Sequence, residues 1–241
     1  MNQTTLGTDE SGQNPARSGK SSSGVTPSKK AKHANDAAFL LFAEPVSVGR
    51  GLMLVAILVC GVLADLLTKH FIFGSYFQPE LVGGPEPVWL IGSWLGIQTS
   101  TNQGALFGMG QGFSVVFAVL SVAALAVLIY LLFVKRWAND LFIAITFSMI
   151  AGGIIGNLYD RLGLWHDANI ASEHANAVRD WIHFRWSGGP KIFDPWPNFN
   201  IADCLLVCGA ILLCFHAFFI QPKMEAAENA KTEASGQDSD E

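Results

Sequence analysis

The chain has 241 residues, of which 50% are hydrophobic and only 15% are charged. Soluble domains carry about 25% charged residues, so this composition disfavours an ordinary globular fold. Twenty acidic and 15 basic residues give a net charge of −5, which argues against a nucleic-acid-binding surface. The charged residues gather near the two ends of the chain, and long uncharged runs separate them. The sequence therefore predicts an all-α membrane protein with polar tails.

The predicted elements begin after a tail over residues 1–45, which is rich in Ser, Gly, Asn and Lys and is expected to be disordered in the cytoplasm. A bilayer core about 30 Å thick needs roughly 20 apolar residues in a helix. Four segments meet this requirement, namely residues 51–73, 113–134, 141–159 and 203–220. We predict a four-span membrane domain over residues 46–221, followed by an acidic cytoplasmic tail over residues 222–241.

The loop after the first span, residues 74–112, contains a stretch with strand character. Residues 85–99 read as one or two short strands that Gly92 and Gly96 interrupt. The stretch is too short for a separate domain. We expect a small β-element that rests on the membrane.

Basic residues predict the orientation of the spans. Lys or Arg residues occur in the N-terminal tail, in the link at Lys135 and Arg136 and, as Lys223 and Lys231, in the C-terminal tail, whereas residues 74–112 contain none. Cytoplasmic loops carry the excess of basic residues, so both termini are expected in the cytoplasm. The second exterior loop, residues 160–200, holds four basic residues and gives a weaker contrast. Six of the seven Trp residues lie in the two exterior loops, which suits the headgroup layer of the outer leaflet.

Polar residues within or beside the spans are costly and need a reason. With this orientation they fall at one depth, near the outer ends of the first, third and fourth spans. The set comprises Asp65, Lys69, Asn157, Asp160, Arg161, Asn200 and Asp203, with Asp180 in the loop between the last two spans. One polar layer that is built from distant parts of the chain is typical of a functional site.

Each part of this layer also has a purely structural interpretation. Asp65 and Lys69 are four residues apart, so a helical ion pair with the Lys side chain snorkelling outward explains them. The Gly152-Gly-Ile-Ile-Gly156 segment contains a GxxxG pattern, which is typical of helix packing. Asn200 and Asp203 fit an N-cap followed by an acid at the third helical position. Their common depth favours a site over these separate explanations.

Four motifs in this layer resemble those of the bacterial lipoprotein signal peptidases, also called signal peptidase II, a family of aspartic membrane proteases. The resemblance covers residues 51–220. The motifs are Asp65-Leu-Leu-Thr-Lys69, Asn102-Gln-Gly-Ala-Leu-Phe-Gly108, Gly152-Gly-Ile-Ile-Gly-Asn-Leu-Tyr-Asp-Arg161 and Phe199-Asn-Ile-Ala-Asp203. The resemblance implies removal of signal peptides from prolipoproteins, just before a diacylglyceryl-modified cysteine, at the outer face of the cytoplasmic membrane.

The resemblance also implies two catalytic aspartates. Asp203 matches one directly, and Asp180 in Ala177-Val-Arg-Asp-Trp181 best matches the Val-x-Asp-aromatic context of the other. The segment between Arg161 and Asp180 is longer than the family usually has, so Asp167 is a rival for the second position. The inserted residues 163–176 also hold two His and two acidic residues, but their spacing fits no standard metal site, and we expect no metal or other cofactor.

Supporting roles follow from the same resemblance. Substrate contacts are expected from Asn102, Gly104, Asn157, Arg161 and Asn200. Structural support is expected from Asp65, Lys69 and Asp160, with Asp160 paired to Arg161. The implied partners are lipidated prolipoproteins and membrane lipids, and the chain is expected to act as a monomer.

Two facing carboxyl groups can hydrolyse a peptide bond without a metal. One carboxylate removes a proton from water while its protonated partner supports the carbonyl and the leaving nitrogen. Asp203 lies in the first turn of a predicted helix, whose dipole favours a negative charge, so we expect Asp203 to be the base and Asp180 the acid. The alternative is a small transporter or channel, although such proteins usually carry their acids near the membrane midplane.

Overall fold

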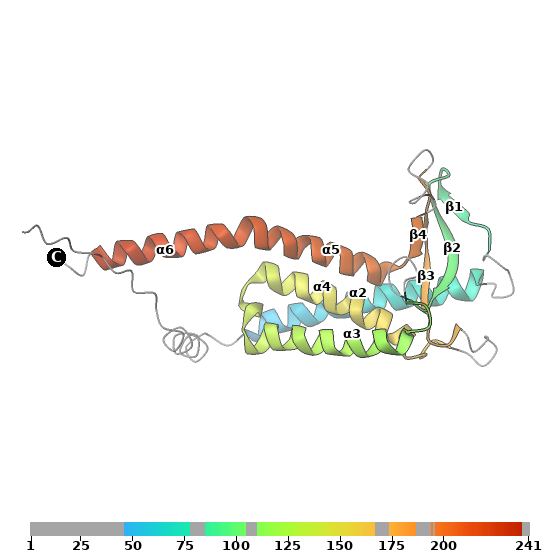
Figure 1. Ribbon diagram of the computed structural model, residues 1–241, viewed down its shortest axis with the longest axis horizontal. Coiled ribbons are helices and arrows are strands. Elements are labelled where there is room, and N and C mark those ends of the chain that lie inside the picture. The colour runs from blue at the N-terminus through green and yellow to red at the C-terminus, as the bar shows by residue number, and fades with distance from the viewer. Residues whose placement is uncertain are drawn as a thin grey trace, which may run out of the picture. The chain divides into compact units, whose positions relative to one another are not determined.

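The computed structural model describes residues 46–77, 85–104, 110–166, 174–186, 194 and 196–237 (Figure 1). All of these residues belong to one compact unit, Ala43–Glu241. Four described helices are long and apolar enough to cross a membrane: Val48–Tyr76, Ser114–Val134, Leu141–Arg161 and Ile201–Ala227. The predicted four-span helical architecture is therefore confirmed.

The first three spans are α2 (Val48–Tyr76), α3 (Ser114–Ile129) and α4 (Leu141–Arg161). A π-helical turn, η2 (Tyr130–Val134), extends α3, and a short 3-10 turn, η3 (Trp137–Asn139), leads into α4. The Asp140 side chain caps α4 by accepting a hydrogen bond from the backbone N–H of Ile143.

The last span consists of α5 (Ile201–Phe215) and a π-helical turn, η6 (His216–Ile220), and helix α6 (Gln221–Gln237) continues from it. The helical conformation therefore extends well into the predicted C-terminal tail, past the expected boundary at residue 221. Apolar side chains on these helices remain exposed in the protein alone, for example Val115 at 69% and Phe218 at 74%. Such surfaces are expected where helices contact lipid chains.

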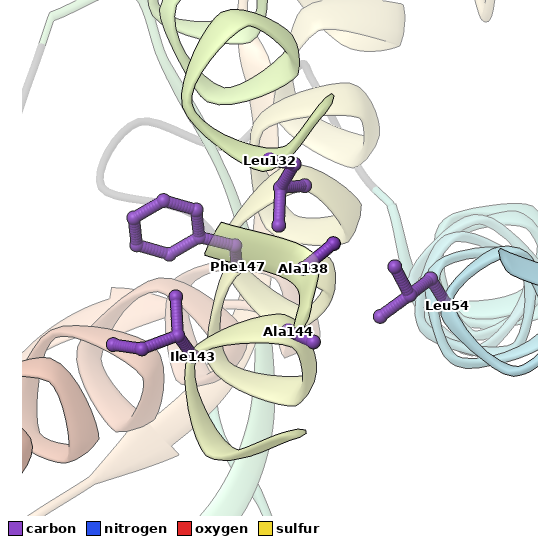
Figure 2. Packing of buried hydrophobic residues seen from close by; sticks show 6 residues of the cluster. All are labelled: Leu54, Leu132, Ala138, Ile143, Ala144 and Phe147. Atoms are coloured by element: carbon purple, nitrogen blue, oxygen red, sulfur yellow. The ribbon is translucent and has the colours of Figure 1, made fainter. Parts of the chain in front are cut away.

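Helix α4 is the most buried span, and it packs against α2, α3 and α5. A cluster of apolar side chains fills the bundle at one end of α4, where Leu54 from α2 lies beside Ala144 and Phe147 (Figure 2). The polar residues of the site lie at the opposite end of the same helices. Since a helix rises 1.5 Å per residue, the 11 residues from Leu54 to Asp65 separate core and site by about 16 Å.

A four-stranded antiparallel sheet lies at the site end of the bundle, in the order β1-β2-β3-β4. Its strands are β1 (Val88–Ile91), β2 (Leu95–Asn102), β3 (Val178–Phe184) and β4 (Trp196–Phe199). The expected strands in the first loop are present, but the second loop supplies half of the sheet, which the sequence analysis did not predict. The charged residues in β3 obscured its strand pattern.

Candidate functional site

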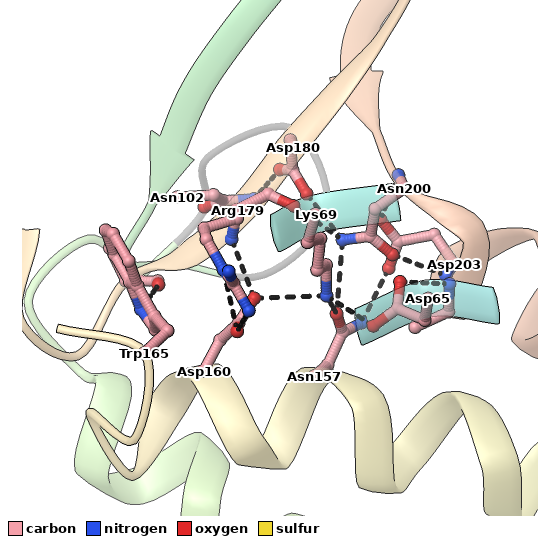
Figure 3. Close-up of polar contacts among 12 residues, drawn as sticks. Asp65, Lys69, Asn102, Asn157, Asp160, Trp165, Arg179, Asp180, Asn200 and Asp203 are labelled. Carbon is pink, nitrogen blue, oxygen red and sulfur yellow. Dashed lines mark hydrogen bonds and ion pairs between the residues drawn. The ribbon is translucent and has the colours of Figure 1, made fainter. Parts of the chain in front are cut away.

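Five elements bring the predicted polar residues together: the ends of α2, β2 and α4, strand β3, and the start of α5 (Figure 3). The register of the sheet pairs Ser100 of β2 with Asp180 of β3, and Asn102 with Val178. Successive side chains of a strand point to opposite faces, so Val178 and Asp180 share a face and Arg179 points away from it.

A buried group of ion pairs forms the base of the site. Lys69 Nζ lies 2.7 Å from Asp65 Oδ2 and 3.1 Å from Asp160 Oδ2, and all three side chains are fully buried. Asp65 Oδ1 also accepts a hydrogen bond from the backbone N–H of Ala202, in the first turn of α5 (2.9 Å). The expected Asp65–Lys69 pair exists, but the expectation that Lys69 snorkels outward is wrong, because two carboxylates hold its ammonium group inside the bundle.

The expected partner of Asp160 is also wrong. Asp160 Oδ1 accepts from Arg179 Nη2 at 2.7 Å, so its arginine partner comes from β3 and is not the adjacent Arg161. Neighbouring residues on a helix point in different directions. The Arg161 guanidinium instead donates to the carbonyl oxygen of Gly104 (3.0 Å) and lies over the Phe117 ring at 5.0 Å.

Two asparagines connect the ion pairs to the predicted catalytic acids. Asn157 Oδ1 accepts from Lys69 Nζ at 3.1 Å, and Asn157 Nδ2 donates to Asp203 Oδ1 at 2.8 Å. Asn200 Nδ2 donates to Asp180 Oδ1 at 2.7 Å and to Asn157 Oδ1 at 3.1 Å. Each amide therefore faces a fixed partner on either side, which sets the orientation of both carboxyl groups.

The start of α5 holds Asp203 through a capping box. Asn200 Oδ1 accepts from the backbone N–H of Asp203 (2.9 Å), and Asp203 Oδ2 accepts from the backbone N–H of Asn200 (3.2 Å). The expected N-cap is therefore present, and the same residues also contact Asp180 and Asn157. A structural cap and a polar site are thus built from one pair of side chains.

Asp180 and Asp203 line the same pocket, whose volume is about 580 Å³. Its polar wall also includes Asn102, Asn157 and Arg161, and Asn102 Nδ2 lies 3.3 Å from Asp180 Oδ2. Burial raises the pKa of Asp180 well above its ordinary value, and the nearby Asp203 raises it further. A carboxyl group whose pKa is raised keeps its proton to higher pH and can therefore act as an acid.

Comparisons with known proteins identify the family of the chain. A family model described as "Signal peptidase (SPase) II" matches residues 56–219. The chain belongs to the signal peptidase II family. A lipoprotein signal peptidase of Rhodopirellula baltica is 42% identical over 160 residues, which cover 66% of this chain and 69% of that protein. One from Rhodococcus jostii is 32% identical over 170 residues, which cover 70% and 74% of the two chains.

A solved structure described as a bacterial membrane enzyme is also similar. It has a TM-score of 0.56 and 26% sequence identity, and the match covers 72% of this chain and 90% of the other. Membership in signal peptidase II makes this chain a multi-pass bacterial membrane protein and an aspartic endopeptidase that removes signal peptides. It decides against the alternative of a transporter or channel.

Some residues of this signal peptidase site had no part in the sequence analysis. Arg179 occupies the unspecified position of the Val-x-Asp context, and a basic residue directly before Asp180 was the available signal. Asn198 lines the pocket from β4, next to Phe199 of the fourth motif, but the strand itself was not predicted. Asp167, the rival for the second catalytic position, lies outside the described residues.

Proposed function

We propose that this signal peptidase cleaves prolipoproteins just before a diacylglyceryl-modified cysteine, with Asp180 and Asp203 as its catalytic pair. The reaction takes place at the outer face of the cytoplasmic membrane, and the enzyme acts as a monomer. The observation that carries the proposal is the shared pocket, in which both carboxyl groups are held by Asn200 or Asn157.

The two acids have different surroundings, which supports different roles. Asp203 accepts hydrogen bonds from Asn157 Nδ2 and from the backbone N–H of Asn200 at the N-terminal end of α5, so both of its oxygens are placed as acceptors. Asp180 is 2% exposed and faces the charge of Asp203, so its protonated form is favoured. Asp203 then removes a proton from the attacking water while Asp180 donates to the substrate carbonyl oxygen. Asp203 next passes the proton it has gained to the leaving nitrogen, Asp180 takes its proton back from the intermediate as the carbonyl re-forms, and the peptide bond breaks.

Arg161 and Asn102 supply further contacts for the peptide. Arg161 lines the pocket, and no described residue accepts a hydrogen bond from its buried Nη1. A substrate carbonyl oxygen would satisfy this donor. Asn102 Oδ1 accepts from the backbone N–H of Gly104, and Gly104 accepts from Arg161, so the three residues form a continuous edge beside Asp180.

The opposite wall of the pocket supports a lipid-carrying substrate. Leu206, Val207 and Cys208 of α5 line the pocket, and Val207 is 56% exposed on the outer surface of the helix. A substrate with acyl chains can therefore reach the carboxyl groups from within the bilayer. The lack of Lys and Arg in residues 74–112 supports placing this end of the bundle at the outer leaflet.

The test is cleavage of a lipidated prolipoprotein by the purified full-length enzyme and by Asp180→Asn, Asp203→Asn and Asp167→Asn variants. Asp140→Asn is the matched control, since Asp140 caps α4 at the other end of the bundle and Asn caps a helix equally well. We expect the first two variants to lose cleavage and the last two to retain it. Retained cleavage in either of the first two would remove the proposed pair, and loss in Asp167→Asn would move the second acid to Asp167.

The same substrate without the diacylglyceryl group tests the substrate class. Because the acyl chains are expected to hold the scissile bond at the depth of the carboxyl pair, the unmodified substrate should be cleaved poorly. Equal cleavage of the two substrates would contradict the proposed requirement for a lipid, whatever the outcome for the aspartates.

A further inference from the structure

Arg179 lies directly before Asp180 in β3, but it belongs to none of the four motifs. Its side chain is 4% exposed, and it is not among the residues that line the pocket of Asp180 and Asp203. A buried arginine is costly unless its charge is paired and its donors are satisfied. The contacts of the Arg179 side chain therefore indicate its role.

Asp160 holds Arg179 through both its side chain and its backbone. Asp160 Oδ1 accepts from Arg179 Nη2 at 2.7 Å and from Nε at 3.0 Å, while Oδ2 accepts from the backbone N–H of Arg179 at 3.0 Å. The carbonyl oxygen of Arg179 lies 3.4 Å from Asn200 Nδ2. The peptide groups on both sides of Arg179 are thus fixed, including the one that leads into Asp180 (Figure 3).

Arg179 also balances the buried charges beneath the site. Asp65, Lys69 and Asp160 alone would leave one net negative charge in a fully buried cluster. The guanidinium of Arg179 completes a group of two acids and two bases with no net charge. This balance matters for Asp180, because any extra negative charge nearby opposes loss of its proton.

Aromatic rings fix the position of the guanidinium. Its centre lies 5.1 Å from the ring centroid of Trp165 and 6.0 Å from that of Phe73. Trp165 Nε1 donates to the carbonyl oxygen of Ala177, so this ring is itself attached to the backbone just before β3. A planar guanidinium can stack on such rings and bind a carboxylate through two donors, which an ammonium group cannot do.

We propose that Arg179 is a positioning residue for Asp180. It neutralises the Asp65–Lys69–Asp160 group and, through Asp160, fixes the strand backbone that carries Asp180. The inference rests on the proposed function, because it takes Asp180 as one of the catalytic pair.

Asp180 faces charged groups from several elements, and the effect of Arg179 on Asp180 has to be distinguished from the effects of these groups. Asp203 of α5, Lys69 of α2 and Arg161 of α4 all interact with it electrostatically. Loss of Arg179 leaves the charge of Asp160 to be balanced by Lys69 alone. The positive field at Asp180 then weakens, and the catalytic pair keeps its shared proton to higher pH.

The experiment compares Arg179→Met, Arg179→Lys and the double variant Arg179→Met with Asp160→Asn, each in the full-length enzyme. The double variant removes both charges of one pair, so its buried group is again neutral. Arg185→Met is the matched control, because Arg185 follows the same strand and lies over a Trp ring at 5.1 Å, but its side chain is exposed. The readouts are kcat, KM and the pH profile for cleavage of the lipidated substrate.

We expect Arg179→Met to lower kcat by about tenfold to a hundredfold while KM changes by less than about twofold, because the acid is misplaced rather than the substrate. The alkaline limb of its pH profile should move to higher pH. In Arg179→Lys and in the double variant, the alkaline limb should stay at the pH of the original enzyme, but kcat should be lower than that of the original enzyme. Arg185→Met should match the original enzyme in every readout.

A merely structural role predicts lower thermal stability with kcat and the alkaline limb unchanged, and that result would overturn the proposal. If Arg179→Met does not fold, Arg179→Lys and the double variant provide the test, because both keep the buried group neutral. An Arg179→Lys enzyme whose kcat equals that of the original enzyme would overturn the proposal. Asp180→Asn and Asp203→Asn run in parallel. Activity in those two variants would mean failure of the proposed function, whereas their inactivity beside a fully active Arg179→Met would reject this inference alone.

Discussion

At the scale of single residues, Asn200 combines two tasks that are usually separate. Its oxygen caps α5 by accepting from the backbone N–H of Asp203, and its amide group donates to Asp180 and Asn157. The side chain is fully buried, and Asp180 Oδ1 and the backbone N–H of Asp203 both use it as a partner. The effect of Asn200 on the stability of α5 and its effect on the orientation of the acids can be measured separately with substitutions that keep the cap but remove the amide group.

Asn200→Ser and Asn200→Ala make this separation. Serine caps a helix about as well as asparagine, whereas alanine costs about 1 kcal/mol at an N-cap. Neither residue can donate to Asp180 as the amide does. We therefore expect both variants to lose most of their kcat, with Asn200→Ala about 1 kcal/mol less stable than Asn200→Ser. Thermal unfolding together with cleavage assays checks this, and full activity in Asn200→Ser would contradict the role of the amide.

The pH dependence of cleavage follows from the surroundings of Asp180. Burial, and then the charge of Asp203, raise the pKa of Asp180 above its ordinary value. An acid with a raised pKa stays protonated to higher pH and is lost as the pH rises through that pKa. The kcat should therefore fall on the alkaline side, by about tenfold per pH unit once the proton is lost. A kcat that keeps rising through the alkaline range would contradict Asp180 as the acid.

At the scale of elements, the glycines of α4 set how closely its neighbours approach. A Cβ at Gly156 would lie 2.5 Å from Asp65 Oδ2, and one at Gly153 would lie 2.5 Å from the carbonyl oxygen of Ala202. A Cβ at Gly152 would lie 3.4 Å from the carbonyl oxygen of Leu58, which is an ordinary contact. The glycine pattern thus serves both packing and the site, since the space at Gly156 is the space that Asp65 occupies.

Gly156→Ala and Gly152→Ala form a matched pair that tests this difference. Gly156→Ala should force Asp65 away from Lys69 or from the Ala202 N–H, at a cost of about 1–3 kcal/mol, and should lower kcat as well. Gly152→Ala should fold and cleave normally, because alanine favours a helix over glycine. Melting temperature and kcat measure both effects. If the two variants had the same melting temperature and the same kcat, the close contact between Gly156 and Asp65 would impose no special constraint.

The elements also differ in how far the sequence predicts them. Four spans follow from uncharged runs of about 20 residues, because lipid imposes length and apolar character on each helix separately. Strand β3 does not follow in the same way, since Arg179 and Asp180 are buried beside partners from other elements. These partners are Asp160 for Arg179, and Asn102 and Asn200 for Asp180. The Asp65–Lys69 pair was predictable from spacing within one helix, whereas the Asp160–Arg179 pair depends on how the second loop folds back.

At the scale of the whole molecule, all the site residues lie at one end of the bundle, at the end of α2 and α4 and at the start of α5. The start of α2 at Val48 and helix α6 lie on the side away from the site (Figure 1). We propose that this side is the cytoplasm. Fusion after Ala227 of a reporter that is active only outside the cytoplasm should give no signal, and a fluorescent protein that folds only inside should give one. The reverse result would invert the orientation.

The terminal segments are expected to be dispensable for the reaction itself. The residues proposed for catalysis and substrate contacts all fall between Asn102 and Asp203, and the ion pairs beneath them begin at Asp65. Deletion of residues 1–45 should therefore leave kcat and KM within about twofold of those of the full chain. Loss of cleavage in a deletion variant that still reaches the membrane would assign the tail a direct part in the reaction.

The sheet has a consequence for biosynthesis. Strand β3 must pair with β2 from the first loop to hold Asp180, and Asp203 opens the final span. Strand β2 is synthesised well before β3 and α5, so the two carboxyl groups cannot meet before the last span has been made and inserted into the bilayer. A chain whose insertion is incomplete therefore has no peptidase activity, and hydrolysis begins only once insertion is finished.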